Sequence, residues 1–443
     1  MNDSRAIIIQ KNSDALSVVA SSGRISTQQG TAMEIYAKSD RGQKDMNLVG
    51  KVLSSGHKSV IEHQTLSVAF NNVSVLAEQY IIEFRLAAYT VKSRRYVDFG
   101  DAGFVIPDDI PESMKDEYAA VMKDRFEDYK KLMELGVPKE DARFVLPYCL
   151  RSNFFMTCDA REMIHMICTM CYGRGSSFPE IKSLGEQLRS QFEEMYPGVI
   201  DGEKARYENS ACEKLVVEFE APYSEEGNAL LINAPENARG ILEDVMGFSG
   251  RFEETFGVYL THANLKKLLT DVRPRELEML NYVFWVRNIS LSCLTHFVRH
   301  RIQSPIVPNV VRALCEGRYV LPETVKAIPE AQVIYEKAFE DQTERAKKAY
   351  EAGVSAEDMG YFALSGHEID ILMNMNAREL LHFFKLRTCN RAQWEIRGVA
   401  WKMLELLRES EHEIFDAFGP SCALGKCPEG KMTCGKPVKG IFD

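Results

Sequence analysis

The chain has 443 residues, which is too long for one typical domain, so about two or three domains are expected. Its formal net charge of −10, without a block of like charge, argues against a nucleic-acid-binding surface but leaves room for a local anion pocket. No apolar run approaches the ~20 residues that span a bilayer, and no signal peptide is expected. The 11 cysteines are scattered without a disulfide framework, so we expect a reduced, cytoplasmic protein with no membrane or nucleic-acid partner.

Hydrophobic patterning predicts a mixture of strands and helices. Residues 64–75 partly alternate and are rich in β-branched side chains, which predicts a strand, and 281–292 is its counterpart. Residues 112–136 and 331–353 are charged, amphipathic segments that each stop at a glycine, which predicts two long helices. Further helices are expected at 159–170 and, as one long element, at 376–410.

Several segments occur twice along the chain at nearly one spacing. The offset is 216 residues between Arg85 and Arg301, and 217 residues for two longer matches further on. These are G-V-P-K-E-D with G-V-S-A-E-D, from Gly136 and Gly353, and D-A-R-E-M-I-H with N-A-R-E-L-L-H, from Asp159 and Asn376. Self-similarity at a fixed spacing indicates a duplicated unit.

The matches predict a tandem organisation. We expect one unit at 1–205, a second at 206–418, and a cysteine-containing tail at 419–443. The connection is expected within 197–227, which is rich in Gly, Pro, Asn and acidic residues.

Cationic and planar donors gather in two segments of this otherwise acidic chain. Guanidinium groups bind phosphate bidentately, so the pattern favours a large anionic ligand such as a nucleotide or dinucleotide. The alternative is that these arginines pair with acidic neighbours such as Glu379 and Glu395. The first segment holds Arg299, His300, Arg301, Arg312 and Arg318, and the second holds Asn376, Arg378, His382, Arg387, Asn390 and Arg391.

The tail carries Cys422, Cys427 and Cys434 in a Gly/Pro-rich sequence. Three thiolates and a fourth ligand from elsewhere would suit zinc or an iron–sulfur cluster. No fourth ligand has the spacing of a known zinc or iron–sulfur motif, so we favour three reduced thiols and expect no metal site.

Taken together, these motifs resemble those of the flavin-dependent thymidylate synthases, the ThyX family, whose signature is R-H-R-x7-S-x-R. The family's upstream segment is matched by G-H-K-S-V-I-E-H from Gly56, and its downstream helix by N-A-R-E-L-L-H-F-F-K-L-R from Asn376. The resemblance implies an α+β fold of two tandem ThyX-like units, each a mixed or antiparallel sheet packed with long helices. It also implies the methylation of dUMP to dTMP by an FAD enzyme, with methylenetetrahydrofolate and NADPH as co-substrates.

The resemblance assigns different roles to the two repeats. In the first repeat, Glu83, Phe84 and Met170 replace family residues of the flavin and nucleotide sites. Matching positions there imply flavin contacts from His57, Ser59 and Glu62, and dUMP contacts from Ser93, Arg95 and Arg143. In the second repeat they imply flavin contacts from Arg299, His300, Arg301, Asn376, Arg378 and His382. Arg387 matches the arginine that binds dUMP and stabilises its ionised ring.

The second repeat has its own departures, at Arg273, Arg275, Glu316 and Gly360, and an insertion at 306–317. We therefore expect one composite site per chain, to which each repeat supplies the groups it has kept. A homodimer would recreate the family's tetramer of units. Alternatives are a flavoenzyme that acts on another pyrimidine nucleotide and a flavin- or nucleotide-binding protein without catalysis.

Overall fold

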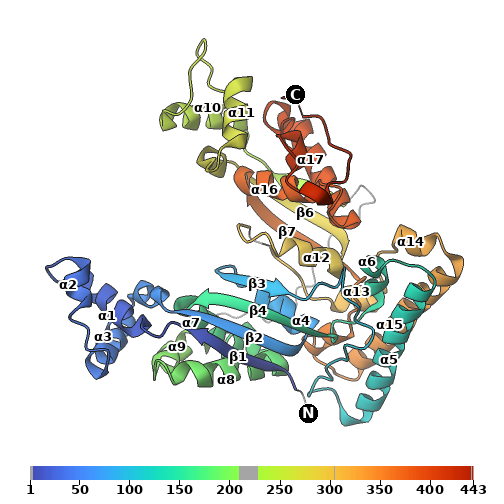
Figure 1. Ribbon diagram of the computed structural model, residues 1–443. Coiled ribbons are helices and arrows are strands. Elements are labelled where there is room, and N and C mark those ends of the chain that lie inside the picture. Colours follow the sequence, from blue (N-terminus) through green and yellow to red (C-terminus); the bar gives the residue numbers. More distant parts are fainter. Residues whose placement is uncertain (1–2, 209–227, 304, 441, 443) are drawn as a thin grey trace. The chain divides into compact units, whose positions relative to one another are not determined.

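The computed structural model describes residues 3–208, 228–303, 305–440 and 442, and its backbone clusters into two compact units (Figure 1). The first unit comprises Met1–Val216, Asn309–Gly317 and Leu321–Ser365, and the second comprises Val217–Pro308, Arg318–Val320 and Gly366–Asp443. These compact units cut across the sequence repeat, because a large part of the second repeat folds with the first unit. The repeat boundaries at 1–205 and 206–418 stay a prediction about the duplication.

The first unit is built on a four-stranded antiparallel sheet with the order β1-β2-β4-β3. The strands are β1 Arg5–Lys11, β2 Thr65–Ser74, β3 Ala87–Val91 and β4 Arg151–Asp159. Along β2, Leu66, Val68 and Phe70 alternate toward the core and are fully buried. The strand predicted at 64–75 is confirmed.

Two helices, α7 Ala160–Cys171 and α8 Pro179–Glu193, contribute to the same apolar core as this sheet. Helix α8 also covers the edge strand β1. Gln187 and Gln191 on α8 accept hydrogen bonds from the backbone N–H groups of Ala6 and Ile8, at 3.0 and 2.8 Å. These side chains satisfy donors that an edge strand otherwise leaves unpaired. The helix predicted at 159–170 is confirmed as α7.

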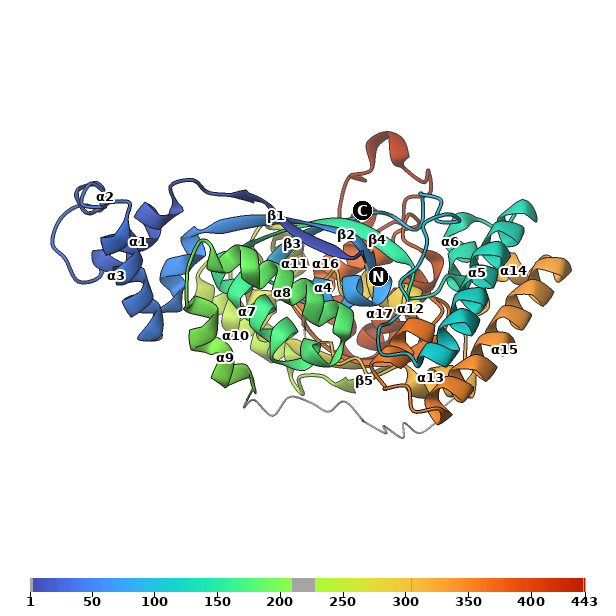
Figure 2. The same cartoon turned by 90° about the horizontal axis from the view of Figure 1, so that it is seen from below.

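The first unit also contains a pair of long helices, one from each repeat. Helix α5 Glu112–Glu134 lies beside α15 Pro329–Glu351 in Figure 1 and Figure 2. The buried Arg125 of α5 joins them, since it donates to the Ala338 carbonyl of α15 at 2.6 Å, and Asp128 of α5 holds it at 2.9 Å. Both predicted helices are confirmed. The insertion at 306–317 forms α13 Val311–Glu316, which packs on α15.

The second unit repeats the sheet in reduced form, with the antiparallel order β5-β6-β7. Its strands are β5 Ala229–Asn233, β6 Asn281–Ser290 and β7 Glu368–Asn376, so the strand predicted at 281–292 is confirmed. Beyond β7, Ile306 and Leu372 exchange two backbone hydrogen bonds of 2.7 and 3.1 Å. The α+β class and the tandem antiparallel sheets predicted from sequence are therefore confirmed.

One prediction of a helix is wrong. The segment 376–410 is not a single helix but contains α16 Ala377–Arg387 and the start of α17 Trp394–Phe415. Gln393 is the physical reason for the second start, because its side chain accepts hydrogen bonds from the N–H groups of Glu395 and Ile396, at 3.0 and 3.1 Å. A side-chain cap of this kind begins a new helix in the middle of an apolar pattern.

The remaining described helices complete the two units. In the first unit they are α1 Ala15–Ile25, α2 Ala32–Tyr36, α3 Gln43–Ser54, η1 Lys58–His63, α4 Val75–Ile82, α6 Lys139–Ala142, η2 Arg143–Val145, η3 Arg174–Ser177, α9 Val199–Glu208, α14 Glu323–Lys326 and η5 Asp358–Phe362. In the second they are α10 Ala238–Ser249, α11 His262–Thr270, η4 Arg275–Met279, α12 Leu291–Phe297, η6 Ser421–Ala423 and η7 Gly430–Met432.

Of the connection expected at 197–227, α9 is described and 209–227 lies outside the described residues. A search of the described helices finds none long and apolar enough to cross a membrane.

Both sheets carry the same irregularity at the same place. The register of β2 shifts between Phe70 and Val73, and that of β6 shifts at the corresponding point. Asn72 and Asn288 sit in these bulges with positive φ angles of 56° and 50°. Asparagine tolerates this left-handed conformation better than most residues. The duplicated framework is thus preserved down to its bulges.

In each repeat, a buried carboxylate accepts hydrogen bonds from the serine that follows the bulge. Glu180 accepts a hydrogen bond from the Ser74 N–H at 2.8 Å, and Glu395 accepts from the N–H and hydroxyl of Ser290 at 2.6 and 2.5 Å. Ser74 and Ser290 in turn cap α4 and α12. Each glutamate therefore fixes the junction between a strand and the helix that follows it.

We predict that Glu395→Ala destabilises the second unit by about 2–4 kcal/mol, because it leaves the buried N–H and hydroxyl donors of Ser290 without an acceptor. The midpoint of urea unfolding, followed by near-UV circular dichroism, measures this. The matched control is Glu405→Ala on the same helix, whose exposed carboxylate lies 3.9 Å from Lys402. The control changes stability by less than about 0.5 kcal/mol. Equal effects of the two substitutions would contradict this account of the junction.

Candidate active site

In the second unit, the buried side chain of His300 joins the R-H-R segment to helix α16. It lies between two charged groups of that helix, with 3% of its surface exposed. The His300 Nδ1 atom is 3.0 Å from a carboxylate oxygen of Glu379, and Arg387 Nε is 3.0 Å from His300 Nε2. Arg387 also donates to the His296 carbonyl at 3.3 Å. The loop after α12 and the last turn of α16 are thereby held together.

The chemistry of the donors fixes the tautomer of His300. A guanidinium group only donates hydrogen bonds, so His300 Nε2 must accept from Arg387. The imidazole proton then sits on Nδ1 and is donated to Glu379. Both ring nitrogens of His300 are therefore engaged within the protein. Its predicted flavin contact stays a prediction.

Burial shifts the proton affinities of both groups in this chain. Desolvation, with the positive charges of Arg387 and His382, holds the pKa of His300 far below its usual range, so the ring is neutral. Desolvation also raises the pKa of Glu379 to about 7, against the opposing pull of His382 and Arg378. In the His300–Glu379 contact, a neutral imidazole therefore donates a hydrogen bond to the Glu379 side chain.

The other predicted residues of α16 lie around this centre. His382 is exposed, and its ring meets that of His300 edge-on, with 5.5 Å between the ring centroids. Asn376 caps the helix, because its side chain accepts from the Glu379 N–H at 2.9 Å. Arg378 is half-buried and pairs with Glu278. Arg299 and Arg301, on either side of His300, are exposed.

Some of these contacts occur in both repeats and therefore do not distinguish them. Asp159 caps α7 by accepting from the Glu162 N–H at 2.9 Å, as Asn376 does for α16. Arg161 pairs with Glu62 at 2.6 Å, as Arg378 does with Glu278. The capping and pairing roles are properties of the duplicated framework.

In the first unit, the structure brings together the three residues of the first repeat that were predicted to contact dUMP. Arg95 forms an ion pair with the carboxylate of Glu140, and buried Arg143 donates to the Glu140 carbonyl at 2.9 Å. The Ser93 hydroxyl accepts from the Arg95 N–H at 3.3 Å. Glu140 organises this group, and its role could not be predicted from sequence because acidic residues are common on such helices.

The predicted flavin contacts of the first repeat lie at the other end of the same sheet. Strand β3 ends with Val91 opposite Phe154, which places Ser93 beside the start of β4. Strand β2 begins with Thr65 opposite Asp159, at the far end of β4. At about 3.4 Å per residue, the two ends are roughly 20–25 Å apart. The segment before β2 carries His57, Ser59 and Glu62, which are all exposed.

The first cationic segment is split between the two units. Arg312 lies on α13 of the first unit and pairs with Glu316 at 2.7 Å, whereas Arg318 belongs to the second. Pairing with acidic neighbours, the alternative raised from sequence, is found for Arg312 with Glu316 and for Arg378 with Glu278. Glu379 accepts from His300 and Glu395 accepts from Ser290.

The tail thiols are partly or fully exposed. The Cys434 sulfur accepts from the Lys436 N–H at 3.4 Å, which is the main cause of its lowered pKa, and Asn390 approaches it at 3.7 Å. The Cys422 sulfur accepts from the Val438 N–H at 3.4 Å. Within the described part of the chain, no group of three or more His, Cys, Asp or Glu side chains has the geometry to hold a metal ion.

Comparison with known proteins identifies the family of the chain. The family model described as "Thymidylate synthase complementing protein" matches the chain twice, at residues 7–198 and 225–410. A flavin-dependent thymidylate synthase of Geobacter sulfurreducens is 37% identical over 185 residues, which cover 41% of this chain and 80% of the relative. One from Thermococcus onnurineus is 37% identical over 193 residues, covering 40% and 77%.

A relative from Sulfurisphaera tokodaii, with the same name, is 39% identical over 149 residues, and the match covers 58% of it. Among solved structures, the UMP/dUMP methylase PolB from Streptomyces cacaoi bound with 5-Br dUMP aligns with a TM-score of 0.39 and 21% identity. That alignment covers 46% of this chain and 96% of the methylase. The family model matches well over half of the chain, so this protein belongs to the family of the flavin-dependent thymidylate synthases, as a tandem member in which the family unit occurs twice.

Proposed function

We propose that the chain methylates dUMP to dTMP, with methylenetetrahydrofolate as the carbon donor, FAD as the cofactor and NADPH as the reductant. The groups for one site come from both repeats, and because the two sets from the first repeat lie roughly 20–25 Å apart along one sheet, they are proposed to contact opposite ends of the bound ligands. The second supplies Arg299, His300, Arg301, Asn376, Arg378, His382 and Arg387, and the first supplies His57, Ser59, Glu62, Ser93, Arg95 and Arg143. A cytoplasmic homodimer is the expected assembly.

The observation that carries this proposal is the fixed position of Arg387. Its Nε–H is committed to the neutral His300 ring, which Glu379 holds from the other side. The guanidinium group of Arg387 keeps its full positive charge, and these contacts hold that charge at a set place. Such a preorganised cation stabilises negative charge that develops on a pyrimidine ring during reaction.

The donor chemistry of the second unit also fits a flavin dinucleotide. Exposed Arg299 and Arg301 suit a pyrophosphate, and exposed His382 offers a planar donor beside them. When bound, the flavin supplies the hydride chemistry, and the protein binds and orients it. The corresponding places of the first repeat hold Glu83, Phe84 and Met170, which lack such donors.

The nucleotide is assigned to the arginines around Glu140. Arg143 is buried and fixed through its Nε–H, and Arg95 is fixed through its ion pair with the same residue. Two guanidinium groups held in this way can bind a phosphate or ring oxygens at low entropic cost. Ser93 is given an orienting role because its hydroxyl is already placed by the Arg95 N–H.

Arg387→Ala is expected to lower kcat for dTMP formation by about 100- to 1000-fold, since it removes the preorganised charge. Flavin content and the circular dichroism spectrum are measured on the same sample, because Arg387 also contacts His300. Arg387→Lys keeps the charge but loses the planar fork, and we expect it to recover part of the rate. A kcat for Arg387→Ala within about two-fold of the parent enzyme would refute the assigned role.

Arg301 and Arg85 occupy equivalent places in the two repeats, which makes them a matched pair. Arg301→Ala is expected to weaken FAD binding by more than about ten-fold, and Arg85→Ala to leave it within about two-fold. Fluorescence titration of the apoprotein with FAD measures both. The assignment fails if only the Arg85 change abolishes binding.

The His300–Glu379 pair predicts a specific dependence of stability on pH. The folded pKa of Glu379 lies above its ordinary value of 4.5, so its contribution to stability falls as pH rises from about 4.5 to 7. The folded pKa of His300 lies below its ordinary value of 6.5, so its contribution falls as pH drops below 6.5. Between pH 4.5 and 6.5 the two slopes oppose each other.

Glu379→Gln keeps an acceptor for His300 but removes the opposing slope. The Tm of this variant should therefore fall more steeply than that of the parent protein between pH 6.5 and 4.5. His300→Gln should show the reverse, with a Tm that rises relative to the parent over the same interval. Differential scanning calorimetry across this range decides the matter, and parallel curves for all three proteins would show that the pair is not coupled as described.

A further inference from the structure

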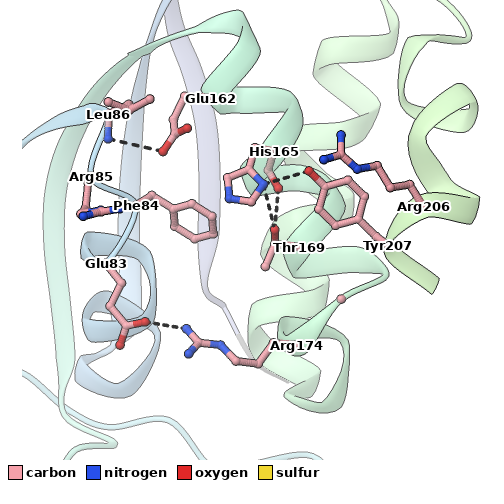
Figure 3. A pocket seen from close by; sticks show the side chains of 11 residues that line it. Glu83, Phe84, Arg85, Leu86, Glu162, His165, Thr169, Arg174, Arg206 and Tyr207 are labelled. Atoms are coloured by element: carbon pink, nitrogen blue, oxygen red, sulfur yellow. Dashed lines mark hydrogen bonds and ion pairs between the residues drawn. The ribbon is translucent and has the colours of Figure 1, made fainter. Parts of the chain in front are cut away.

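The first unit contains a cleft of about 670 Å³ that the proposed reaction does not use. It is lined by the segment 83–86 after α4, by one side of α7 and by the end of α9 (Figure 3). Its volume is within the range of about 300–1,000 Å³ that is usual for small-molecule sites.

This cleft occupies, in the first repeat, the place that the R-H-R segment and α16 have in the second. Arg85 and His165 correspond to Arg301 and His382 and are kept. Phe84 and Met170, which replace His300 and Arg387, are buried in the core. The substitutions therefore filled the interior beneath the cleft but left its polar lining open to solvent.

Three aromatic rings adjoin along one side of the cleft, with interplanar angles of 71° between Phe84 and His165 and 40° between His165 and Tyr207. The ring centroids of Phe84 and His165 are 5.4 Å apart, and those of His165 and Tyr207 are 5.9 Å apart. The Tyr207 hydroxyl lies 2.8 Å from His165 Nδ1, which fixes both rings in place. Stacking of a nucleic-acid base on such a ring is worth about 1–3 kcal/mol.

The charges around these rings favour a ligand with one acidic group. Arg174 is neutralised by Glu83 at 2.5 Å and lies over the Tyr80 ring, 4.8 Å from its centroid. Arg206 lines the cleft with a 73% exposed side chain, and its ion pair with Glu203 is long, at 3.8 Å. The Glu162 carboxylate is buried and accepts from the Leu86 N–H at 3.4 Å. Positive charge therefore remains at the mouth, beside Tyr207.

From the adjoining aromatic rings and the arginine beside them, we propose that this cleft is a second ligand site that binds a nucleoside monophosphate. The base stacks on His165 and Tyr207, which Phe84 supports from beneath, and the phosphate meets Arg206. A flavin dinucleotide is disfavoured here, because the places of Arg299, His300 and Arg387 hold Glu83, Phe84 and Met170. This exclusion of a flavin rests on the proposed function, because that function assigns the flavin to Arg299, His300 and Arg387. The cleft and its lining residues are independent of the proposed function.

The test is equilibrium dialysis of the FAD-loaded enzyme with radiolabelled dTMP, which counts nucleotides bound per chain. We expect two, one at the proposed catalytic site and one in the cleft. Thr169→Trp fills the cleft without removing a charge and should leave one. Its matched control is Thr270→Trp on α11, since both threonine hydroxyls are exposed and donate at 2.7 Å to the carbonyl four residues earlier. The control should bind two.

A second pair of variants tests the phosphate contact. Arg206→Gln should raise the Kd of the cleft site about ten-fold, which corresponds to 1.4 kcal/mol. Arg41→Gln is the control, because Arg41 is 66% exposed and its ion pair with Asp14 is 3.7 Å long. It should leave both sites unchanged.

The outcomes separate this inference from the proposed function. If Thr169→Trp binds as much dTMP as the parent enzyme, the cleft site does not exist. This holds even if Arg387→Ala abolishes binding at the proposed catalytic site. If Arg387→Ala changes nothing and Thr169→Trp removes the only bound nucleotide, the cleft site stands and the proposed catalytic site fails.

Discussion

The structure of the candidate site depends on one buried hydrogen-bonded chain, from Glu379 through His300 to Arg387. An imidazole without water can stay in the core only if both of its nitrogens have partners. The carboxylate accepts from one nitrogen and the guanidinium donates to the other, which leaves His300 neutral and sets the orientation of Arg387. A buried histidine thereby fixes a partly exposed cation, to which the proposed function assigns the chemistry.

Comparison of the two repeats distinguishes residues that maintain the fold from residues assigned to the site. The bulges at Asn72 and Asn288 and the carboxylates of Glu180 and Glu395 are kept in both repeats, because each satisfies buried backbone groups that every copy has. At Arg387 and its counterpart Met170 the repeats differ. The shared bulges and carboxylates belong to the framework, whereas Arg387, which only the second copy keeps, carries the chemistry in the proposed function.

Much of the fold follows from the sequence, because strands with alternating burial and long amphipathic helices have a clear period. The break between α16 and α17 escaped prediction, since it depends on the Gln393 side chain as a cap and not on any change in hydrophobic pattern. The association of α5 with α15 escaped as well, because a packing choice between two similar amphipathic helices leaves no local signal. Both features depend on tertiary context.

The candidate site was only partly predictable for a similar reason. Motif spacing identified Arg387, Arg95 and Arg143, but it gave no sign that His300 is buried or that Glu140 and Glu379 organise the arginines. The central claim is that each chain holds one flavin site, although the family unit occurs twice. The most direct test is the visible absorption spectrum of purified protein saturated with FAD and freed of excess, recorded before and after addition of dUMP. The account predicts one FAD per chain and a flavin spectrum that dUMP perturbs. Two FAD per chain, or none in folded protein, would contradict it.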